Sequence, residues 1–307
     1  MKTFKKPPLS IEQQVDQWEK RGLIIPDRDR IIRYLNVISY YRLSGYTLPF
    51  QIPAATNHNF KKNIKFDDIL DLYIFDRQLR LLVMDAIERI EVGLRSVLNN
   101  FMAVKYGSHW YMESKHFMQR YRHNDLLEDM KELLKRKRKE VFIQHYIDTY
   151  CEPKLPPGWM MIEIISFGQL SWMYENLSKA EDRKAIARFF NTPDIVFISW
   201  MKSLNYLRNL CAHHSRLWNR EMAITPKTFK RVPESWIQLP IKVADPKIKP
   251  EKRIYMLLVI IRHLLKSVNK SSSWHNRLIS LFNEHSNISK PHMGIPEKWL
   301  DDPFWDG

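Results

Sequence analysis

The chain has few glycines and almost no cysteine. It has only 8 Gly in 307 residues, while Leu, Ile, Glu, Lys and Arg are plentiful, and this composition favours helices over sheets. Its two cysteines, Cys151 and Cys211, are distant in sequence, which excludes a disulfide framework and indicates a reducing compartment. We therefore expect an all-α protein in the cytoplasm.

Long apolar runs are also missing. The longest, near residues 256–261, is far too short to cross a bilayer, and the N-terminus is charged without the apolar core of a signal peptide. No glycine-rich phosphate loop is present, and the histidines lack Asp, Cys or His partners at ligand spacing. We expect no membrane association, no nucleotide hydrolysis, no metal and no cofactor.

Positive charge, in contrast, is in large excess. The formal net charge is +15 and the isoelectric point is near 9.6. An ordinary soluble protein can have such a surface, but the cations here occur in blocks. Blocks favour a nucleic-acid partner, because clustered cations release condensed counterions from phosphates. We expect phosphate contacts from two blocks, Lys131, Lys135, Arg136, Lys137, Arg138 and Lys139, and Lys227, Lys230 and Arg231.

Capping signals and apolar periodicity predict a succession of helices. Ser10 and Gln13 have capping-box spacing, Asp27 is placed to cap a second helix, and Pro193 precedes the helix of the central motif. The predicted helices cover about 10–21, 27–38, 67–104, 125–150, 159–177, 181–190, 194–220, 251–268 and 274–285. Residues 1–8, 51–63 and 151–158 and the proline-containing tail are predicted to be irregular.

Three parts follow from this pattern. We predict an N-terminal helical extension over 1–62, a helical core over 63–225, and a basic loop with C-terminal helices and an irregular tail over 226–307. The tyrosines of segment 40–46 have the chemistry to stack on bases. Aromatic clusters beside a turn more often pack, and we expect this one to dock the extension onto the core.

The chain is organised around residues 205–220. In a helix, one stripe of this region is apolar, at Trp200, Leu204, Leu207 and Cys211. The opposite side has Asn205, Arg208, Asn209, Ala212 and Arg216, with His213 at its edge. A guanidinium binds phosphate oxygens in a fork, and an imidazole transfers protons near pH 7. The cluster therefore has the groups needed to hold and cleave a phosphodiester.

The spacing from Arg to His alone is a weak signal. Arg138 and His145 match it equally well, but Arg138 is followed by Lys139 rather than a small polar residue, and we interpret that pair as coincidence. The context of Arg208 differs, because an Asn follows it directly, two adjacent histidines come next, and the chain continues into Leu-Trp-Asn-Arg at 217–220. Without further context, a satisfied polar core is the competing interpretation.

The long helix predicted over 67–104 turns charged at its far end. Glu88, Glu91 and Arg95 are neighbours at i, i+3 and i+7. They form either a self-satisfied surface network, worth a few tenths of a kcal/mol per pair, or a support beside Arg208 that fixes its guanidinium. The residues alone leave both interpretations open.

Several stretches resemble a known family. LRNLCAHHSRLWNR at 207–220 is similar to the signature of the Abi-like abortive-infection proteins of bacteria, the AbiD/AbiF type, which belong to the HEPN superfamily of helical ribonucleases. KPPLS at 6–10, YYRLSGY at 40–46, LYIFDR at 72–77, AIERIEVGLR at 86–95 and SFGQLS at 166–171 resemble further landmarks. The resemblance covers about residues 6–220.

This resemblance implies a HEPN-type helical bundle and a metal-independent endoribonuclease. In the implied reaction the ribose 2′-OH attacks the adjacent phosphate, His213 transfers the proton, Arg208 stabilises the charge on the phosphorane, and Asn209 orients Arg208 or the phosphate. Asn205 is a supporting residue, and His214, expected about 100° further around the helix, is either structural or a second base. The resemblance also favours a supporting role for Glu88, Glu91 and Arg95, with Glu88 or Glu91 beside Arg208. The family also implies a homodimer with one composite site, a role in phage defence, and a small structured non-coding RNA that restrains the enzyme. The alternative is a non-catalytic RNA-binding module.

Overall fold

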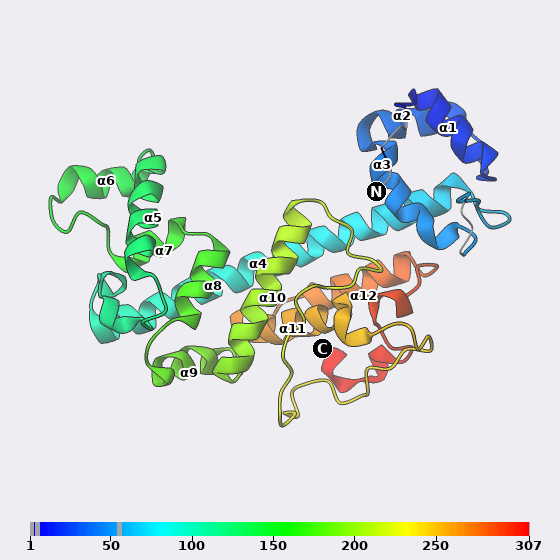
Figure 1. The fold of residues 1–307 in the computed structure, drawn as a ribbon. Coiled ribbons are helices and arrows are strands. Elements are labelled where there is room, and N and C mark those ends of the chain that lie inside the picture. Colours follow the sequence, from blue (N-terminus) through cyan, green and yellow to red (C-terminus); the bar gives the residue numbers. More distant parts are fainter. Residues whose placement is uncertain (1–2, 4–6, 54–56, 307) are drawn as a thin grey trace. The chain divides into compact units, whose positions relative to one another are not determined.

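The computed structural model describes residues 3, 7–53 and 57–306, and these form an all-α fold (Figure 1). The prediction of the fold class is confirmed. Most of the lead-in predicted for residues 1–8, and the centre of the loop predicted for 51–63, lie outside the described residues. Within the described residues, extended pairing is limited to isolated bridges such as Gln51 with Phe60.

The chain divides into two compact units. Unit 1 is Met1–Arg80 with Ser280–Ile288, and unit 2 is Leu81–Ile279 with Ser289–Gly307. The helices α4 (Phe66–Tyr106) and α12 (Trp274–Glu284) each contribute residues to both units. The domain boundaries at residues 62 and 225 stay predictions. No helix among the described residues has the length and apolar character needed to cross a membrane.

Unit 1 begins with three helices, α1 (Ile11–Lys20), α2 (Arg28–Ile38) and α3 (Tyr40–Thr47). The capping signals act as predicted. Ser10 and Gln13 form a complete capping box at α1, and the Asp27 side chain accepts a hydrogen bond from the Arg30 backbone N–H at α2. Because these signals are local, the sequence predicts both helix starts to within one residue.

The tyrosine segment of α3 packs within unit 1. Tyr40 stacks on Trp18 with ring centres 4.5 Å apart, and Tyr46 meets Tyr73 edge to face. The buried Tyr46 hydroxyl donates to Asp76 Oδ2 (2.7 Å), and Asp76 also pairs with the buried guanidinium of Arg80. Burial raises the pKa of the Tyr46 hydroxyl above its ordinary value. The buried side chains of Tyr46, Asp76 and Arg80 thereby hold α3 against α4.

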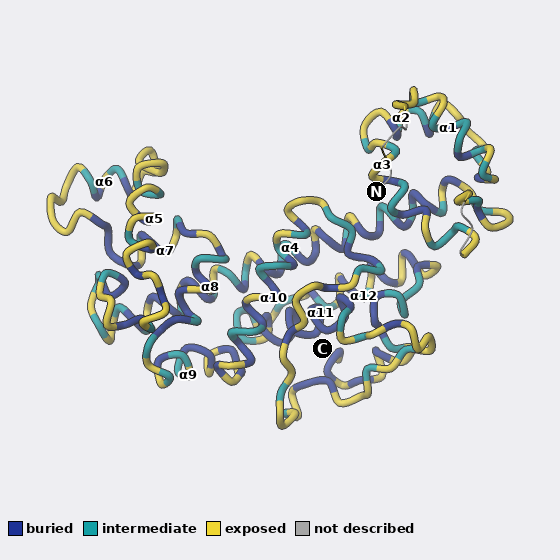
Figure 2. The backbone as a smooth tube through the Cα atoms, in the orientation of Figure 1, coloured by how far each residue is buried: buried dark blue, intermediate teal, exposed yellow. Residues whose placement is uncertain are grey.

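Unit 2 contains the remaining helices. They are α5 (His123–Arg136), α6 (Val141–Thr149), α7 (Gly158–Ile164), α8 (Phe167–Glu175), α9 (Ala180–Phe189), α10 (Asp194–Ala212) and α11 (Ile254–Val268). Nearly every residue of α11 is buried, as the dark trace in Figure 2 shows. Helix α10 packs most closely on α8 and also contacts α9 and α11. The core of unit 2 lies along α10 and α11.

Two predictions of single helices were wrong. The helix expected over 125–150 is interrupted between α5 and α6, where five consecutive cations at 135–139 place like charges next to one another along the helix. The helix expected over 159–177 is interrupted between α7 and α8. There Ser166 leaves the helical conformation and forms a capping box with Gln169 that starts α8.

The C-terminal region packs on α11 through aromatic side chains. Its tail has only short 3-10 turns, at Pro291–Met293, Trp299–Asp301 and Pro303–Trp305, which agrees with the predicted irregular tail. Trp299, Phe304 and Trp305 are nevertheless buried. The basic stretch before α11 contributes Trp236, which stacks on Trp200 of α10 with ring centres 5.2 Å apart.

Candidate functional site

The apolar stripe predicted for the motif helix fixes the orientation of α10. Trp200, Leu204 and Leu207 are completely buried, and Cys211 is 4% exposed. The indole N–H of Trp200 donates to the Lys227 carbonyl oxygen (2.7 Å). With this stripe in the core, the opposite side of α10 faces outward, as the sequence predicted.

Helix α10 ends earlier than predicted. The expected helix over 194–220 was wrong beyond Ala212, because the chain leaves the helix in a Schellman motif. The backbone N–H of Ser215 donates to the Leu210 carbonyl (2.8 Å), and that of His214 donates to the Cys211 carbonyl (2.9 Å). His214 adopts the left-handed conformation (φ 54°) that glycine usually supplies at this position. Its side chain therefore does not follow the 100° step of a continuing helix.

Arg208, Asn209 and His213 lie together in the last turn and cap of α10. His213 is the C-cap residue, and its backbone N–H donates to the Asn209 carbonyl (3.0 Å), so it stays one turn beyond Asn209. Asn209 and His213 are exposed, and Arg208 is half-buried. An Nη1–H of Arg208 donates to Asn209 Oδ1 at 3.5 Å, which is long for a hydrogen bond. The three side chains offer a guanidinium, an amide and an imidazole at the protein surface.

The second half of the motif, at residues 217–219, anchors the chain to the core of unit 2. Leu217 and Trp218 are buried, and the Trp218 indole N–H donates to the Ser289 carbonyl (3.2 Å). Asn219 Oδ1 accepts a hydrogen bond from Nη1 of the buried Arg253 (3.1 Å). These contacts hold the chain that follows the Schellman turn, and thereby the position of the histidines. No residue pattern in the motif indicated this division between exposed and anchoring residues.

A cleft of about 520 Å³ opens beside the motif, between α8 and α10. Its lining residues are Arg120, Gly168, Ser171, Trp172, Glu175, Asn176, Lys202, Asn205 and Ile224. Trp172 is 57% exposed and also borders a second hollow of about 310 Å³ formed with Tyr121 and α5. Asn205, predicted as a supporting residue, lies about 4.5 Å along the helix axis from Arg208.

Cations dominate the rim of this cleft but share one acid. Lys202 Nζ lies 2.7 Å from Glu175 Oε1, and an Arg120 Nη2 lies 3.9 Å from the same oxygen. Arg120 also donates to Asn176 Oδ1 (3.2 Å). With two cations and one carboxylate, the cleft keeps a surplus of positive charge next to an exposed indole. Sequence reasoning missed Arg120, Trp172 and Lys202.

Gly168 explains how closely α8 approaches α10. A Cβ at this position would lie 3.2 Å from Asn205 Nδ2, tighter than ordinary van der Waals contact. The SFGQLS stretch therefore supplies both the cap of α8 and the small residue that lets Asn205 reach the cleft. Its resemblance to a family landmark was the available signal, but the residue pattern did not show the role of the glycine.

The charged end of α4 has a structural role. Glu91 pairs with Arg95, which is buried and also donates to the carbonyl oxygens of Ile162 and Ile165 (2.9 Å to the latter) at the end of α7. Glu88 is exposed. Arg95 therefore stabilises unsatisfied carbonyls at a helix C-terminus. Support of Arg208 by Glu88 or Glu91 stays a prediction.

The two basic blocks are at the surface. In the first, Lys131, Lys135 and Lys137 pair with Glu128, Glu132 and Glu140 at 2.6, 2.7 and 3.4 Å. Among the described residues, Arg136, Arg138 and Lys139 have no such ion pair, so this block keeps a surplus of charge. The second block is also exposed, at Lys227, Lys230 and Arg231.

Two comparisons with known proteins gave no match, and one did. A family model described as Abi-like protein matches residues 33–219. The matched region ends at the anchor of the motif and includes α8, α10 and the cleft between them. No curated protein and no solved structure matches the chain significantly. In the part of the chain that the structure describes, no three His, Cys, Asp or Glu side chains are grouped as metal ligands.

Proposed function

The chain belongs to the Abi-like protein family, and on that premise we propose that it is a cytoplasmic, metal-independent endoribonuclease of the HEPN type that acts in abortive infection. The observation that carries the proposal is the grouping of Arg208, Asn209 and His213 at the exposed end of α10, opposite a fully buried stripe. A helix end held by the Schellman turn and the Trp218 anchor presents these groups outward, where a polymer can reach them.

The proposed reaction uses the RNA as its own nucleophile. The ribose 2′-oxygen loses its proton to an imidazole and attacks the adjacent phosphorus. The bond to the 5′-oxygen breaks, and that oxygen takes a proton, which leaves a 2′,3′-cyclic phosphate and a 5′-hydroxyl. Arg208 stabilises the negative charge on the phosphorane, an electrostatic contribution typically of a few kcal/mol. Asn209, within reach of the guanidinium, orients it.

Two copies of the chain supply the acid and the base in this proposal. Each copy contributes one His213, and the reaction needs one group to remove a proton and another to donate one. Because Asn209 and His213 are exposed, a second copy can face them without any rearrangement of the core. A homodimer with a single composite site is the arrangement that we propose.

The cleft between α8 and α10 is the proposed path of the RNA strand. Its cationic rim suits the backbone, and the exposed face of Trp172 suits an unpaired base. Asn205 joins the cleft to the motif, since it lies one helical turn before Arg208 and Asn209. A nucleotide bound in the cleft would therefore be next to the one whose phosphate Arg208 holds.

A purified-protein assay tests the chemistry. An RNA oligonucleotide is incubated with the wild type, with Arg208→Ala/His213→Ala and with Arg33→Ala/His58→Ala. The last variant is a matched control, because it removes the same two residue types from exposed positions elsewhere. We expect cleavage by the wild type and the control only, in the presence of a metal chelator, and none of an all-2′-deoxy strand. Cleavage by all three proteins would contradict the assignment.

The second candidate is a non-catalytic RNA-binding module in a ribonucleoprotein. It is favoured by the unpaired surplus of Arg136, Arg138 and Lys139 on the surface of the first basic block. His213→Ala separates the two functions. A nuclease loses cleavage and keeps its affinity for RNA, whereas a binding module never cleaves and loses at most a little affinity.

A structured non-coding RNA that restrains the enzyme belongs to the same proposal. The blocks at 131–139 and 227–253 would hold it, and the net charge of +15 is far more than a short scissile strand requires. Protein purified at low salt should carry RNA and should bind structured RNA with a steep salt dependence. RNA-free protein without salt-dependent affinity would refute this part.

A further inference from the structure

One buried arginine differs from the others in its partners. Four arginines are buried among the described residues, and three of them pair with a carboxylate: Arg80 with Asp76, Arg95 with Glu91 and Arg253 with Glu221. Arg262 of α11 is 3% exposed and has no such pair within the described chain. Its Nη2 donates to the Asp306 carbonyl, while its Nε and Nη1 have no hydrogen-bond partner there.

Packing against aromatic rings offsets part of the free-energy cost of burying the Arg262 charge. The guanidinium carbon of Arg262 lies 5.5 Å from the ring centre of Phe304 and 5.4 Å from that of Trp305. Each cation–π contact is weaker than the cost of burying an uncompensated charge. Burial accordingly lowers the pKa of Arg262 to about 10. Asp306 counteracts this shift in part, but among the described residues no carboxylate forms an ion pair with Arg262.

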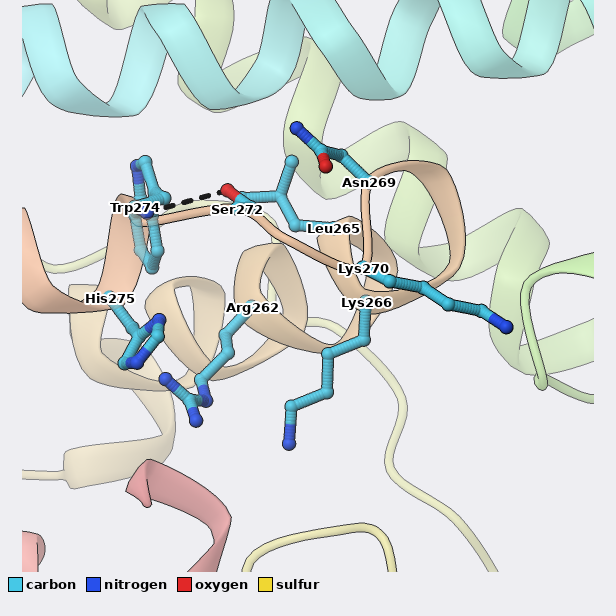
Figure 3. A pocket seen from close by; sticks show the side chains of 8 residues that line it. All are labelled: Arg262, Leu265, Lys266, Asn269, Lys270, Ser272, Trp274 and His275. Atoms are coloured by element: carbon cyan, nitrogen blue, oxygen red, sulfur yellow. Dashed lines mark hydrogen bonds between the residues drawn. The ribbon is translucent and has the colours of Figure 1, made fainter. Parts of the chain in front are cut away.

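A small pocket adjoins this arginine at the turn between α11 and α12 (Figure 3). It is lined by Arg262, Leu265, Lys266, Asn269, Lys270, Ser272, Trp274 and His275. Figure 3 shows the side chains of Arg262, Lys266 and His275 projecting from the same side of this turn, while Lys270 extends along the rim. The space amounts to about 50 Å³, enough for about four water molecules.

The cations at this pocket repel one another. Burial lowers the pKa of the His275 imidazole, and the nearby Arg262 and Lys266 lower it further. Burial and Arg262 likewise lower the pKa of Lys266, whose Nζ lies 4.8 Å from the Phe304 ring centre. The C-terminal end of α11 favours a cation in its last turn, which accounts for Lys266. Arg262 is one turn earlier and is not explained in this way.

We propose that this pocket binds a phosphate group, with the buried Arg262 as its fixed charge and Lys266, His275 and the polar side chains of the turn as its donors. A tetrahedral oxyanion fits the volume, and the two negative charges of a phosphate monoester match Arg262 and Lys266, whereas a carboxylate supplies one. The phosphate is either free or carried by a nucleotide or an RNA end. The site is separate from the proposed RNA-cleaving motif.

Isothermal titration calorimetry at constant ionic strength tests the site. Sodium phosphate is titrated into full-length protein carrying Arg208→Ala, so that the motif does not contribute. We expect saturable binding with one phosphate per chain, weakened about tenfold by Lys266→Gln, the size expected for one charge-assisted hydrogen bond. Arg262→Gln should abolish it. Lys184→Gln, an exposed lysine on α9, is the matched control and should bind like the parent.

The source of the phosphate is separated by two further titrants. A ribonucleoside 5′-monophosphate that binds more tightly than inorganic phosphate, or a 5′-phosphorylated RNA that binds more tightly than the same RNA with a 5′-hydroxyl, identifies a nucleotide-borne group when Lys266→Gln removes the difference. Equal affinity identifies free phosphate. No saturable binding of any of the three overturns the proposal. Equal weakening by Lys266→Gln and Lys184→Gln also overturns it, because affinity would then follow net charge rather than this pocket. Circular dichroism of each variant confirms that it is folded.

Discussion

Acidification should loosen the core that supports the motif helix, through a single histidine. His263 of α11 is 4% exposed and packs its ring against Trp200 and Trp236, each with ring centres 5.3 Å apart. Its Nε2 lies 3.2 Å from the Phe190 carbonyl oxygen, which makes it the donor. Burial lowers the pKa of His263 to about 4, with a smaller contribution from Lys266. The folded state therefore keeps this imidazole neutral.

The size of the effect follows from linkage. An unfolded histidine has a pKa of about 6.5, so between pH 6.5 and about 4 the unfolded state binds the proton and the folded state does not. The contribution to stability is complete above pH 6.5 and is lost as the pH falls. The loss is about 1.4 kcal/mol per pH unit, or about 3 kcal/mol by pH 4.

Urea unfolding at several pH values measures this contribution. His263→Gln keeps a donor for the Phe190 carbonyl but cannot titrate. Between pH 7 and pH 4.5, the free energy of unfolding of the wild type should fall about 2.4 kcal/mol further than that of the variant. Only the difference between the two proteins is used, because His116 and His275, whose pKa values are also lowered, titrate in both. Parallel curves for the two proteins would refute the reasoning.

Two further substitutions test the core of unit 1 and the cleft. Asp76→Asn leaves the buried Arg80 without its charge partner and should lower the free energy of unfolding by about 3–5 kcal/mol. Tyr46→Phe removes one hydrogen bond and should lower it by about 1 kcal/mol. Equal losses of stability for the two variants in thermal unfolding would count against a charge effect. Trp172→Ala should weaken the binding of single-stranded RNA about tenfold, with little change in stability. Trp159 has a similar exposure (49%), and Trp159→Ala should leave RNA binding unchanged. Equal affinities of the two variants would exclude stacking on Trp172.

The parts of the fold that depend on local chemistry could be predicted. Ser10 and Asp27 start helices because the capping groups lie within three residues of the N–H groups they satisfy. Ser166 and Gln169 have the same spacing, but the apolar residues on both sides of them favoured a single continuous helix over 159–177. The end of α10 had no such signal, because a histidine occupies the left-handed position where glycine is usual.

The candidate site could be predicted only along one helix. Periodicity places Arg208, Asn209 and His213 opposite the buried stripe of α10, and this needs no tertiary information. The cleft depends on α8 lying against α10, with Gly168 next to Asn205. Arg120 and Trp172 are distant from the motif in sequence, and no periodicity within one element connects them. Within the described part of the chain, the lack of an ion pair at Arg262 likewise appears only when the partners of the buried arginines are compared.

The most direct test of the account is induction of the protein in bacteria, with the ends of the cellular RNA mapped. Wild type, Arg208→Ala/His213→Ala and the control Arg33→Ala/His58→Ala are expressed to equal levels, in cells from which any cognate non-coding RNA has been deleted. We expect growth arrest and RNA fragments with 2′,3′-cyclic phosphate ends from the wild type and the control, and neither from the motif variant. Equal arrest and equal fragmentation from all three proteins would contradict the assignment of catalysis to Arg208 and His213.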